Sequence, residues 1–454
     1  MALSVSDRDC VRYGLHGGYY LHHASGRRHT LDSDTDILNL KSVSRAYAGL
    51  FVTEHQFQAP LDYASPHGPM IDIFARAVVS ADKASANQPW LLYLEGGPGF
   101  EGPRPYGGSA PAWLDRALED YRVIFLDQRG MGRSSPVGVA DAIKWAPHVL
   151  ADRLTHYGAS AVIRDAERLR DALGIPAWSV LGQSYGGFCT VAYLSAFPGS
   201  LTEAFITGGL PTLERPIDDV YRKTYATVID KTRRHYVRFP EDRERVLELI
   251  DRAAAGELVL PCGDRATQHR VRHLGLLLGA GQGSERLHYL LELPFDSPAF
   301  LHDFERAASF ARNPLFAVIH ESSYALGQVT NWAAQRTLPD DYQTDPALLT
   351  GEHICPWMFD EIAGLAPFRD AAHLLAAHPW APIYDLDVLN ANRVPCAAAI
   401  YADDMYVPRD YSEATAKQIH GLKPWITNEF EHDGVRAGGG RVLDRLIKLA
   451  RNQI

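Results

Sequence analysis

The strongest constraint on the fold is a Gly-x-Ser-x-Gly pentapeptide between a strand-like and a helix-like segment. The apolar run 178–181 is predicted to be a buried strand, it breaks at 182–186, and the segment 188–194 is compatible with a helix. A tight turn of this kind forces Ser184 into a strained backbone conformation, and its glycines let neighbouring backbone pass without a clash. Since the turn lifts the Ser184 hydroxyl into open space, we interpret Ser184 as a nucleophile rather than an idle serine in a glycine-rich turn.

Two backbone N–H groups are candidates for stabilising the oxyanion that a serine nucleophile generates. The N–H of Tyr185 lies at the predicted start of the helix, where it can face a developing negative charge. A second glycine-rich loop, Glu-Gly-Gly-Pro-Gly at 95–99, follows the apolar strand predicted at 90–94. Its glycines allow the backbone to approach a scissile carbonyl, so we expect Gly97 to be the second donor. The alternative is that this loop is a Gly/Pro turn with no role in catalysis.

Strand-like and helix-like segments alternate in the first part of the chain, which is typical of a parallel sheet covered by helices on both faces. The predicted strands are 50–54, 71–79, 90–94, 122–126 and 178–181, and the intervening helices lie near 111–119 and 159–173. Strand patterns return at 394–401 and about 425–430, with helices near 410–420 and 441–451. Active sites of such sheets form in the loops at the carboxyl ends of the strands, where the glycine-rich loops emerge.

The order of these patterns predicts the domain organisation. We expect an α/β protein of the α/β-hydrolase fold, with a mostly parallel, doubly wound sheet and an inserted helical cap domain. Residues 1–44 are expected to form an N-terminal extension. The hydrolase core is expected to comprise 45–211 and 389–454, and the helix-rich segment 212–388 is expected to form the cap.

A serine nucleophile needs a base and an orienting carboxylate, which follow the serine in α/β-hydrolases in the order acid, then histidine. His432 comes after the last predicted strand and is the one among 19 histidines that stands at the required place. Asp403 and Asp404 both follow the strand predicted at 394–401. We prefer Asp404, because the apolar alternation and the following Met-Tyr-Val-Pro suit it better, and Asp403 stays the alternative.

The bulk properties favour a globular protein and exclude several function classes. Hydrophobic residues make up 46% and charged residues 22% of the 454 residues, so wholesale disorder is not expected. A formal net charge of −10, without a long Lys/Arg run, argues against a nucleic-acid partner. No run approaches the ~20 apolar residues of a spanning helix, so no membrane partner is expected.

Neither a metal nor a cofactor is expected from the sequence. The five cysteines are scattered without C-x-x-C spacing, which argues against a disulfide framework or a zinc site and favours a reducing, cytoplasmic compartment. Gly130-x-Gly132 is similar to the start of a dinucleotide fingerprint, but Ser135 stands where the third glycine is needed.

Three motifs together resemble those of the prolyl aminopeptidases (proline iminopeptidases), serine peptidases of the α/β-hydrolase fold. They are Gly-Gly-Pro-Gly at 96–99, Asp-Gln-Arg-Gly-x-Gly-x-Ser at 127–134 and Gly-Gln-Ser-Tyr-Gly-Gly at 182–187. The stretches 403–407 and 431–434 are similar to those of the family's longer bacterial branch, and the resemblance covers about 46–454. Glu95 stands where the family more commonly has a histidine.

The resemblance implies metal-independent release of N-terminal proline from small peptide substrates. In the family, cap glutamates hold the protonated α-amine through charge-assisted contacts, which exclude internal peptide bonds. The segment 320–324 resembles the matching cap segment, so Glu321 is the first candidate for this role and Glu352 the second; a solvated surface charge is the alternative for each. Two other functions stay open: another α/β-hydrolase (an esterase, an amidase or a longer-peptide aminopeptidase) and an inactive hydrolase scaffold used for binding.

Overall fold

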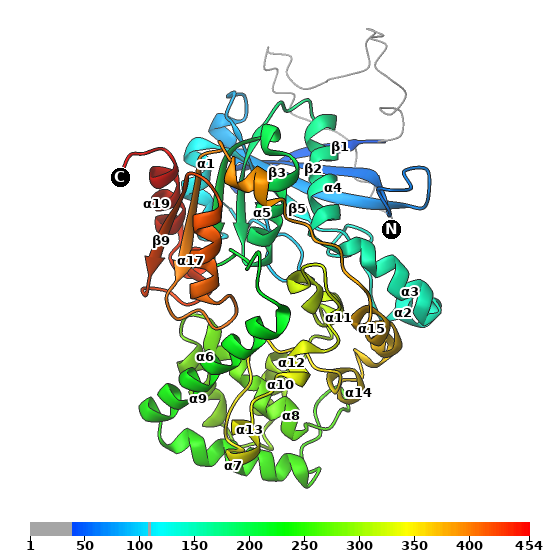
Figure 1. Ribbon diagram of the computed structural model, residues 1–454, viewed down its shortest axis with the longest axis vertical. Helices are drawn as coiled ribbons and strands as arrows, with labels where there is room; N and C mark the ends of the chain where they lie inside the picture. Colours follow the sequence, from blue (N-terminus) through cyan, green and yellow to red (C-terminus); the bar gives the residue numbers. More distant parts are fainter. Residues whose placement is uncertain (1–38, 108–109) are drawn as a thin grey trace, which may run out of the picture.

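The computed structural model describes residues 39–107 and 110–454 (Figure 1). Most of the predicted N-terminal extension, residues 1–38, lies outside the described residues. Its last residues belong to strand β1 (Lys41–Tyr47), whose residues are all exposed. β1 pairs antiparallel with β2 (Leu50–Pro60) at one edge of the sheet.

A nine-stranded sheet, in the order β1-β2-β3-β5-β4-β6-β7-β8-β9, forms the centre of the described protein. The other strands are β3 (Met70–Ser80), β4 (Trp90–Leu94), β5 (Arg122–Asp127), β6 (Trp178–Gln183), β7 (Leu201–Thr207), β8 (Cys396–Tyr401) and β9 (Leu422–Thr427). The pairings from β1 to β5 are antiparallel, and those from β5 to β9 are parallel. The predicted mostly parallel sheet is therefore confirmed.

Burial of the parallel strands explains which of them the sequence predicted. Every residue of β6 and β8 is buried, because helices cover both faces, and their sequences are correspondingly mostly apolar. β7 was not among the predicted strands, since Thr202 and Glu203 interrupt its apolar pattern. β9 begins earlier than predicted, at Leu422. Its Pro424 argues against a central strand, but β9 is the edge strand, where a missing N–H is tolerated.

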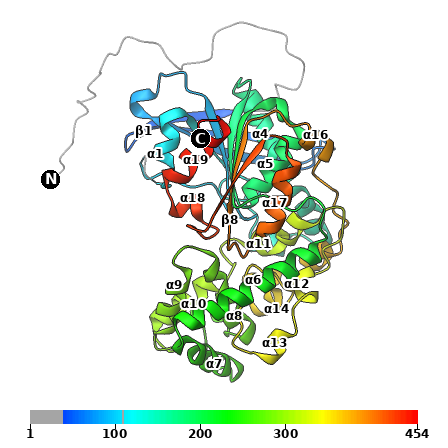
Figure 2. The same ribbon diagram turned by 60° about the vertical axis from the view of Figure 1, so that its left-hand side comes forward.

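Helices cover the two faces of the sheet and bury two separate apolar clusters (Figure 1 and Figure 2). α1 (Leu114–Asp120) and α19 (Gly440–Ala450) pack against each other on one face. α4 (Ala159–Ala172), α5 (Tyr185–Ala196) and α17 (Arg409–Gln418) lie on the other. The remaining helices of the core are α2 (Val139–Lys144), α3 (Pro147–Leu154) and α18 (Gly434–Ala437). This is the doubly wound arrangement that the sequence predicts.

Between β7 and β8 the chain forms a helical segment that adds no strand to the sheet. Its helices are α6 (Ile217–Arg238), α7 (Glu241–Ala254), α8 (Gln268–Arg272), α9 (Gly283–Leu291), α10 (Pro298–Ala307), α11 (Pro314–Ile319), α12 (Ala333–Arg336), α13 (Asp341–Thr344), α14 (Met358–Glu361), α15 (Arg369–Ala376) and α16 (Leu386–Asn390), with the 3-10 helices η5 (His273–Gly279), η6 (Glu321–Tyr324) and η7 (Ala366–Phe368). Figure 1 shows most of them gathered at one end of the sheet. Within the described residues, no helix combines the length and apolar character needed to cross a membrane.

The Asp-Gln-Arg motif at 127–129, which begins with the last residue of β5, fixes the loops beside this end of the sheet. Asp127 accepts hydrogen bonds from the N–H groups of Gly102 and Arg133, at 3.0 and 2.9 Å. Gln128 donates to the carbonyl of Glu95 at 2.8 Å and so holds the glycine-rich loop that follows β4. The side chains of Asp127 and Gln128 thus supply hydrogen-bond partners to backbone groups of these loops.

Arg129 forms an ion pair inside the core. Its side chain is fully buried and makes two hydrogen bonds with Asp165 of α4, at 2.6 and 2.8 Å. It also donates to the carbonyls of Leu61 and His156 at 2.8 Å, and Tyr63 donates its hydroxyl to Asp165 at 2.7 Å. Every polar atom of this buried pair thus has partners, which is the condition for a buried ion pair to be tolerated.

Removing one partner of this pair should destabilise the protein strongly. We expect Asp165→Ala to lower the free energy of unfolding by about 3–5 kcal/mol, because it leaves the Arg129 charge buried and uncompensated. Chemical denaturation followed by tryptophan fluorescence measures the change. As a control, Arg306→Ala removes an exposed pair with Asp303 and should change stability by less than about 1 kcal/mol. Equal denaturation midpoints for the two variants would contradict this account.

Candidate active site

Ser184 lies in the tight turn between β6 and α5 with a backbone conformation that side chains rarely adopt. Its φ and ψ are 55° and −124°, which is strained for a residue with a Cβ. Its N–H donates to the carbonyl of Thr207 at 2.9 Å. A Cβ on Gly186 would lie 1.9 Å from the oxygen of Leu94, and a Cβ on Gly182 would lie 2.2 Å from the oxygen of Gly186. The turn predicted from the pentapeptide thus depends on close backbone packing at both glycines.

Three side chains from distant parts of the chain meet at this turn. Ser184 Oγ lies 2.7 Å from His432 Nε2, and His432 Nδ1 lies 2.7 Å from Asp404 Oδ2. All three side chains are buried. The other oxygen of Asp404 accepts hydrogen bonds from the N–H groups of Tyr406 and Val407, at 2.8 and 3.0 Å, which fixes the orientation of the carboxylate. Carboxylate, imidazole and hydroxyl thus contact one another in series, which is the arrangement that lets a histidine accept the proton of a serine.

Asp403, the alternative acid, lies elsewhere. Its side chain is 52% exposed and pairs with Arg234 of α6 at 3.1 Å. The structure therefore brings Asp404, rather than Asp403, to His432.

The charges around His432 favour its protonated form. Burial alone would lower the pKa of His432, but the charge of Asp404, its hydrogen bond and the charge of Glu352 together outweigh burial. Arg436 acts in the opposite direction and only weakens this effect. The net result is a pKa above the ordinary histidine value of 6.5, so His432 is a stronger base than an isolated imidazole.

The glycine-rich loop after β4 runs beside Ser184. A Cβ on Gly96 would lie 3.0 Å from Ser184 Cβ, so the two backbones are in close contact. The N–H of Gly96 donates to the Glu95 carboxylate at 2.8 Å. By contrast, the N–H groups of Gly97 and Tyr185 donate to no other group in the part of the chain that the structure describes. No hydrogen bond among the described residues therefore uses these two sequence-predicted donors.

Glu352 shares a buried aromatic environment with the histidine. Its carboxylate lies 3.2 Å from His320 Nε2 and its side chain is 15% exposed. Burial raises the pKa of Tyr324 and Tyr406, and the charge of Glu352 raises both further. The Tyr406 ring packs edge-on against His432 with ring centroids 4.9 Å apart, and Tyr324 donates its hydroxyl to the carbonyl of Tyr406 at 3.2 Å. Glu352 is thus electrostatically coupled to His432.

Glu321, the first candidate for binding an amine, makes different contacts. It is buried, and its Oε1 accepts a hydrogen bond from the N–H of Ala334 in α12 at 2.9 Å. Its second oxygen is buried without a hydrogen-bond partner among the described residues. Burial raises the pKa of Glu321, although the hydrogen bonds at the start of α12 oppose this. Of the two glutamates, it is Glu352 whose charge reaches His432.

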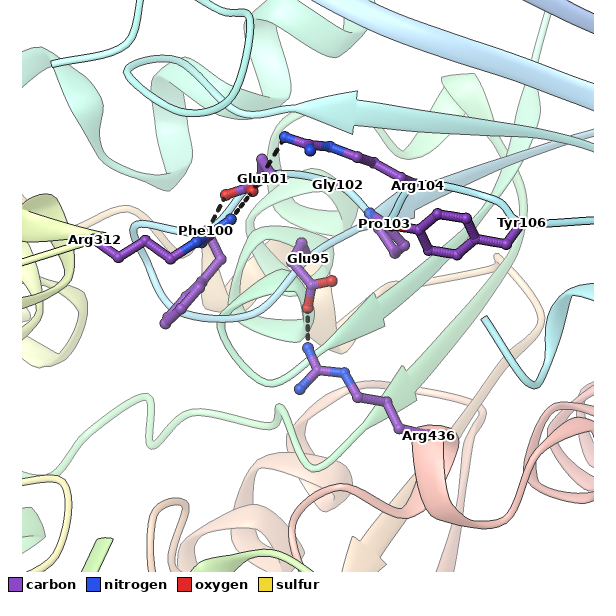
Figure 3. Close-up of a pocket in the computed structure, with 9 residues that line it drawn as sticks. All are labelled: Glu95, Phe100, Glu101, Gly102, Pro103, Arg104, Tyr106, Arg312 and Arg436. Atoms are coloured by element: carbon purple, nitrogen blue, oxygen red, sulfur yellow. Dashed lines mark hydrogen bonds and ion pairs between the residues drawn. The ribbon is translucent and has the colours of Figure 1, made fainter. Parts of the chain in front are cut away.

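Two basic residues beside the site, His320 and Arg436, were not among the residues predicted from the sequence. His320 is the partner of Glu352, and Arg436 of α18 pairs with Glu95 (Figure 3). Glu95 and Arg436 lie on the wall of a cavity of about 290 Å³, whose other lining residues are Phe100, Glu101, Gly102, Pro103, Arg104, Tyr106 and Arg312. The signal for Arg436 was the carboxylate at position 95, since a buried carboxylate needs a cation or several donors nearby.

One cluster of potential metal ligands lies in the helical segment. It consists of Glu241, Asp242 and His288, each of which places one ligand atom within 4.8 Å of those of the other two. Asp242 is buried and already contacts both His235 and His288 at 3.0 Å. These contacts join α6, α7 and α9, and the cluster shares no residue with the contacts around Ser184.

Comparison with known proteins identifies relatives along most of the chain. A family model described as alpha/beta hydrolase fold matches residues 89–243. The chain is 42% identical over 420 residues to a proline iminopeptidase of Aeromonas sobria, which covers 89% of this chain and 97% of that protein. It is 32% identical over 431 residues to a proline iminopeptidase of Aspergillus aculeatus, with 88% and 94% of the two chains covered.

The position of Asp404 makes a prediction about the titration of His432. In the unmodified protein the imidazole should titrate above about 6.5. In Asp404→Asn the burial that favours the neutral ring is no longer offset by the partner's charge, so the pKa should fall below this value. NMR of ¹³C-labelled histidine, with His432→Gln to assign the resonance, measures both values. An unchanged or higher pKa in Asp404→Asn would contradict the assigned coupling.

Proposed function

This chain belongs to the proline iminopeptidases of the α/β-hydrolase fold, and on that basis we propose that Ser184, His432 and Asp404 form its catalytic triad. Family membership makes the protein a serine aminopeptidase. The observation that carries the residue assignment is the unbroken series of contacts from Asp404 through His432 to Ser184, at 2.7 Å each. Its substrates are peptides, and we infer small peptides with an N-terminal proline.

In the proposed mechanism, Ser184 Oγ attacks the prolyl carbonyl while His432 Nε2 takes the hydroxyl proton. Asp404 holds the imidazole in the tautomer that presents an unprotonated Nε2 and stabilises the imidazolium that forms. The N–H groups of Gly97 and Tyr185 donate to the tetrahedral oxyanion. His432 then protonates the leaving amine. Water, deprotonated by His432, hydrolyses the prolyl ester and restores the Ser184 hydroxyl.

We propose that Glu352 binds the protonated amine of the N-terminal proline, with Glu321 as the second candidate. Charge and geometry support this: the charge of Glu352 raises the pKa of His432, Tyr324 and Tyr406, and the Tyr406 ring packs against the His432 ring. The partner of Glu352 is the imidazole of His320 rather than a fixed cation. A substrate ammonium can therefore take over this contact, which is a charge-assisted one.

We further propose that the segment 212–388 is a cap that closes the site on the substrate's amino-terminal side. One contact and one charge interaction support this: the N–H of His432 donates to the carbonyl of Gly279 at 3.1 Å, and the charge of Glu352 raises the pKa of His432. A closed end on the amine side restricts hydrolysis to the first peptide bond. For the compartment we propose the cytoplasm, supported by the four described cysteines, all of which are free.

The proposed specificity is tested by a panel of aminoacyl arylamides and short-chain esters. Proline arylamide should be hydrolysed far faster than the other compounds, and Ser184→Ala should lower kcat by about 10⁴-fold or more. Turnover of esters alone would favour another α/β-hydrolase activity, and turnover of nothing would favour an inactive scaffold. Full activity of Ser184→Ala would refute the nucleophile assignment.

Amine recognition is tested separately with the two glutamates. Glu352→Gln should lower kcat/KM for proline arylamide by about 10- to 100-fold, because a hydrogen bond to a charged group is worth about 1.5–3 kcal/mol. It should leave the hydrolysis of an ester without an amine nearly unchanged. Glu321→Gln is the matched control and should affect the two substrates equally, since its Oε1 binds the backbone of α12. The reverse pattern would transfer the role to Glu321.

A further inference from the structure

The carboxylate of Glu95 stands between the oxyanion loop and the loop that carries His432. Its side chain is 7% exposed and its Oε1 accepts hydrogen bonds from the N–H of Gly96, at 2.8 Å, and from the guanidinium of Arg436 (Figure 3). Its Oε2 lies 3.4 Å from the hydroxyl of Tyr93. The Glu95 carbonyl accepts a hydrogen bond from Gln128 Nε2 at 2.8 Å. Both the backbone and the side chain of this residue are therefore fixed.

Arg436 connects this carboxylate with the segment that carries the nucleophile. Its guanidinium lies 3.4 Å from Gln183 Oε1, and Gln183 Nε2 donates to the carbonyl of His432 at 3.5 Å. Gln183 is also the neighbour of the oxyanion loop, since a Cβ on Gly96 would lie 2.6 Å from its Oε1. The contacts around Glu95 and Arg436 thus join the three loops that follow β4, β6 and β9.

We propose that Glu95 and Arg436 are positioning residues that hold the oxyanion loop and the His432 loop in register with Ser184. The inference rests on the proposed function and adds the residues that hold the oxyanion loop and the His432 loop in place. By accepting the Gly96 N–H, Glu95 orients the peptide plane one residue before Gly97, whose own N–H stays free for the oxyanion. Donors aimed at a developing charge act only if they are held in place before the reaction, so this pair contributes to the transition state rather than to substrate binding.

The two partners differ in exposure, which makes the pair testable without removing core structure. The Arg436 side chain is 53% exposed, whereas the Glu95 side chain is buried. Arg436→Gln therefore removes the cation from the exposed side of the pair and leaves the buried Glu95 uncompensated. Arg436→Lys keeps a positive charge but loses the planar group that reaches both Glu95 and Gln183.

The experiment compares Glu95→Gln, Arg436→Gln, the double variant and Arg436→Lys in the full-length protein. We expect each single variant to lower kcat for proline arylamide by about 10- to 100-fold, which is within the range for damage to one oxyanion donor, with KM changed less than about twofold. The double variant should lose no more than the worse single variant, because the residues act as one unit. Arg436→Lys should recover part of kcat.

A second readout separates positioning from general structural damage. Proline boronic acid, which places a negatively charged oxygen at the oxyanion position, should lose affinity in parallel with kcat, whereas free proline should bind as before. Active sites are titrated with a phosphonate so that kcat refers to competent protein. Arg312→Gln, which removes a cation from the same cavity by breaking its pair with Glu101, is the matched control and should retain the original kcat.

The proposal is overturned if kcat per titrated site is unchanged in both single variants. It is equally overturned if boronic acid and free proline lose affinity to the same extent, or if Arg312→Gln does the same damage. These outcomes do not contradict the proposed function, because that is tested by the activity of Ser184→Ala.

Discussion

The turn at Ser184 exists because backbone occupies the space on each side where a side chain would otherwise stand. Gly186 packs on the carbonyl of Leu94, and Gly187 on the backbone of Gly209. Positive φ at a residue with a Cβ costs on the order of 1–3 kcal/mol, so the conformation persists only if its surroundings determine it. They do so because β6 and all but the last residue of α5 are buried and cannot relax independently. The position of every other group at the site is defined relative to this turn.

The buried carboxylates around the turn have different partners, and the partners of each carboxylate indicate its role. Asp404 binds an imidazole and two backbone N–H groups, and Glu95 binds a guanidinium and one N–H group. Glu321 binds the start of α12. Among the described residues, Glu352 forms an ion pair only with the imidazole of His320, and its side chain is 15% exposed. A desolvated carboxylate without a permanent cation is the one with most to gain from binding a cationic ligand.

Local patterns in the sequence predicted the parts of the fold that local physics determines. The strand, turn and helix around Ser184 have a complete signature within a few residues, and the chain order of acid and histidine led to Asp404 and His432. β7 escaped because polar residues interrupt a strand that its neighbours nevertheless bury. The pairing of Glu95 with Arg436 joins positions that are far apart in the sequence, and the preference between Glu321 and Glu352 depends on side-chain direction. Such contacts are set by tertiary packing, which no local pattern encodes.

On the proposed function, the same charges that recognise the substrate also adjust the base. In the free protein Asp404 and Glu352 both favour the protonated form of His432, which cannot accept the proton of Ser184. An ammonium group bound beside Glu352 offsets one of these two charges, so the pKa of His432 falls when the substrate arrives. A substrate without an amine leaves that charge in place and finds more of the histidine protonated. Recognition of the amino terminus thereby enters the chemical step itself, because occupation of the amine site makes the base available.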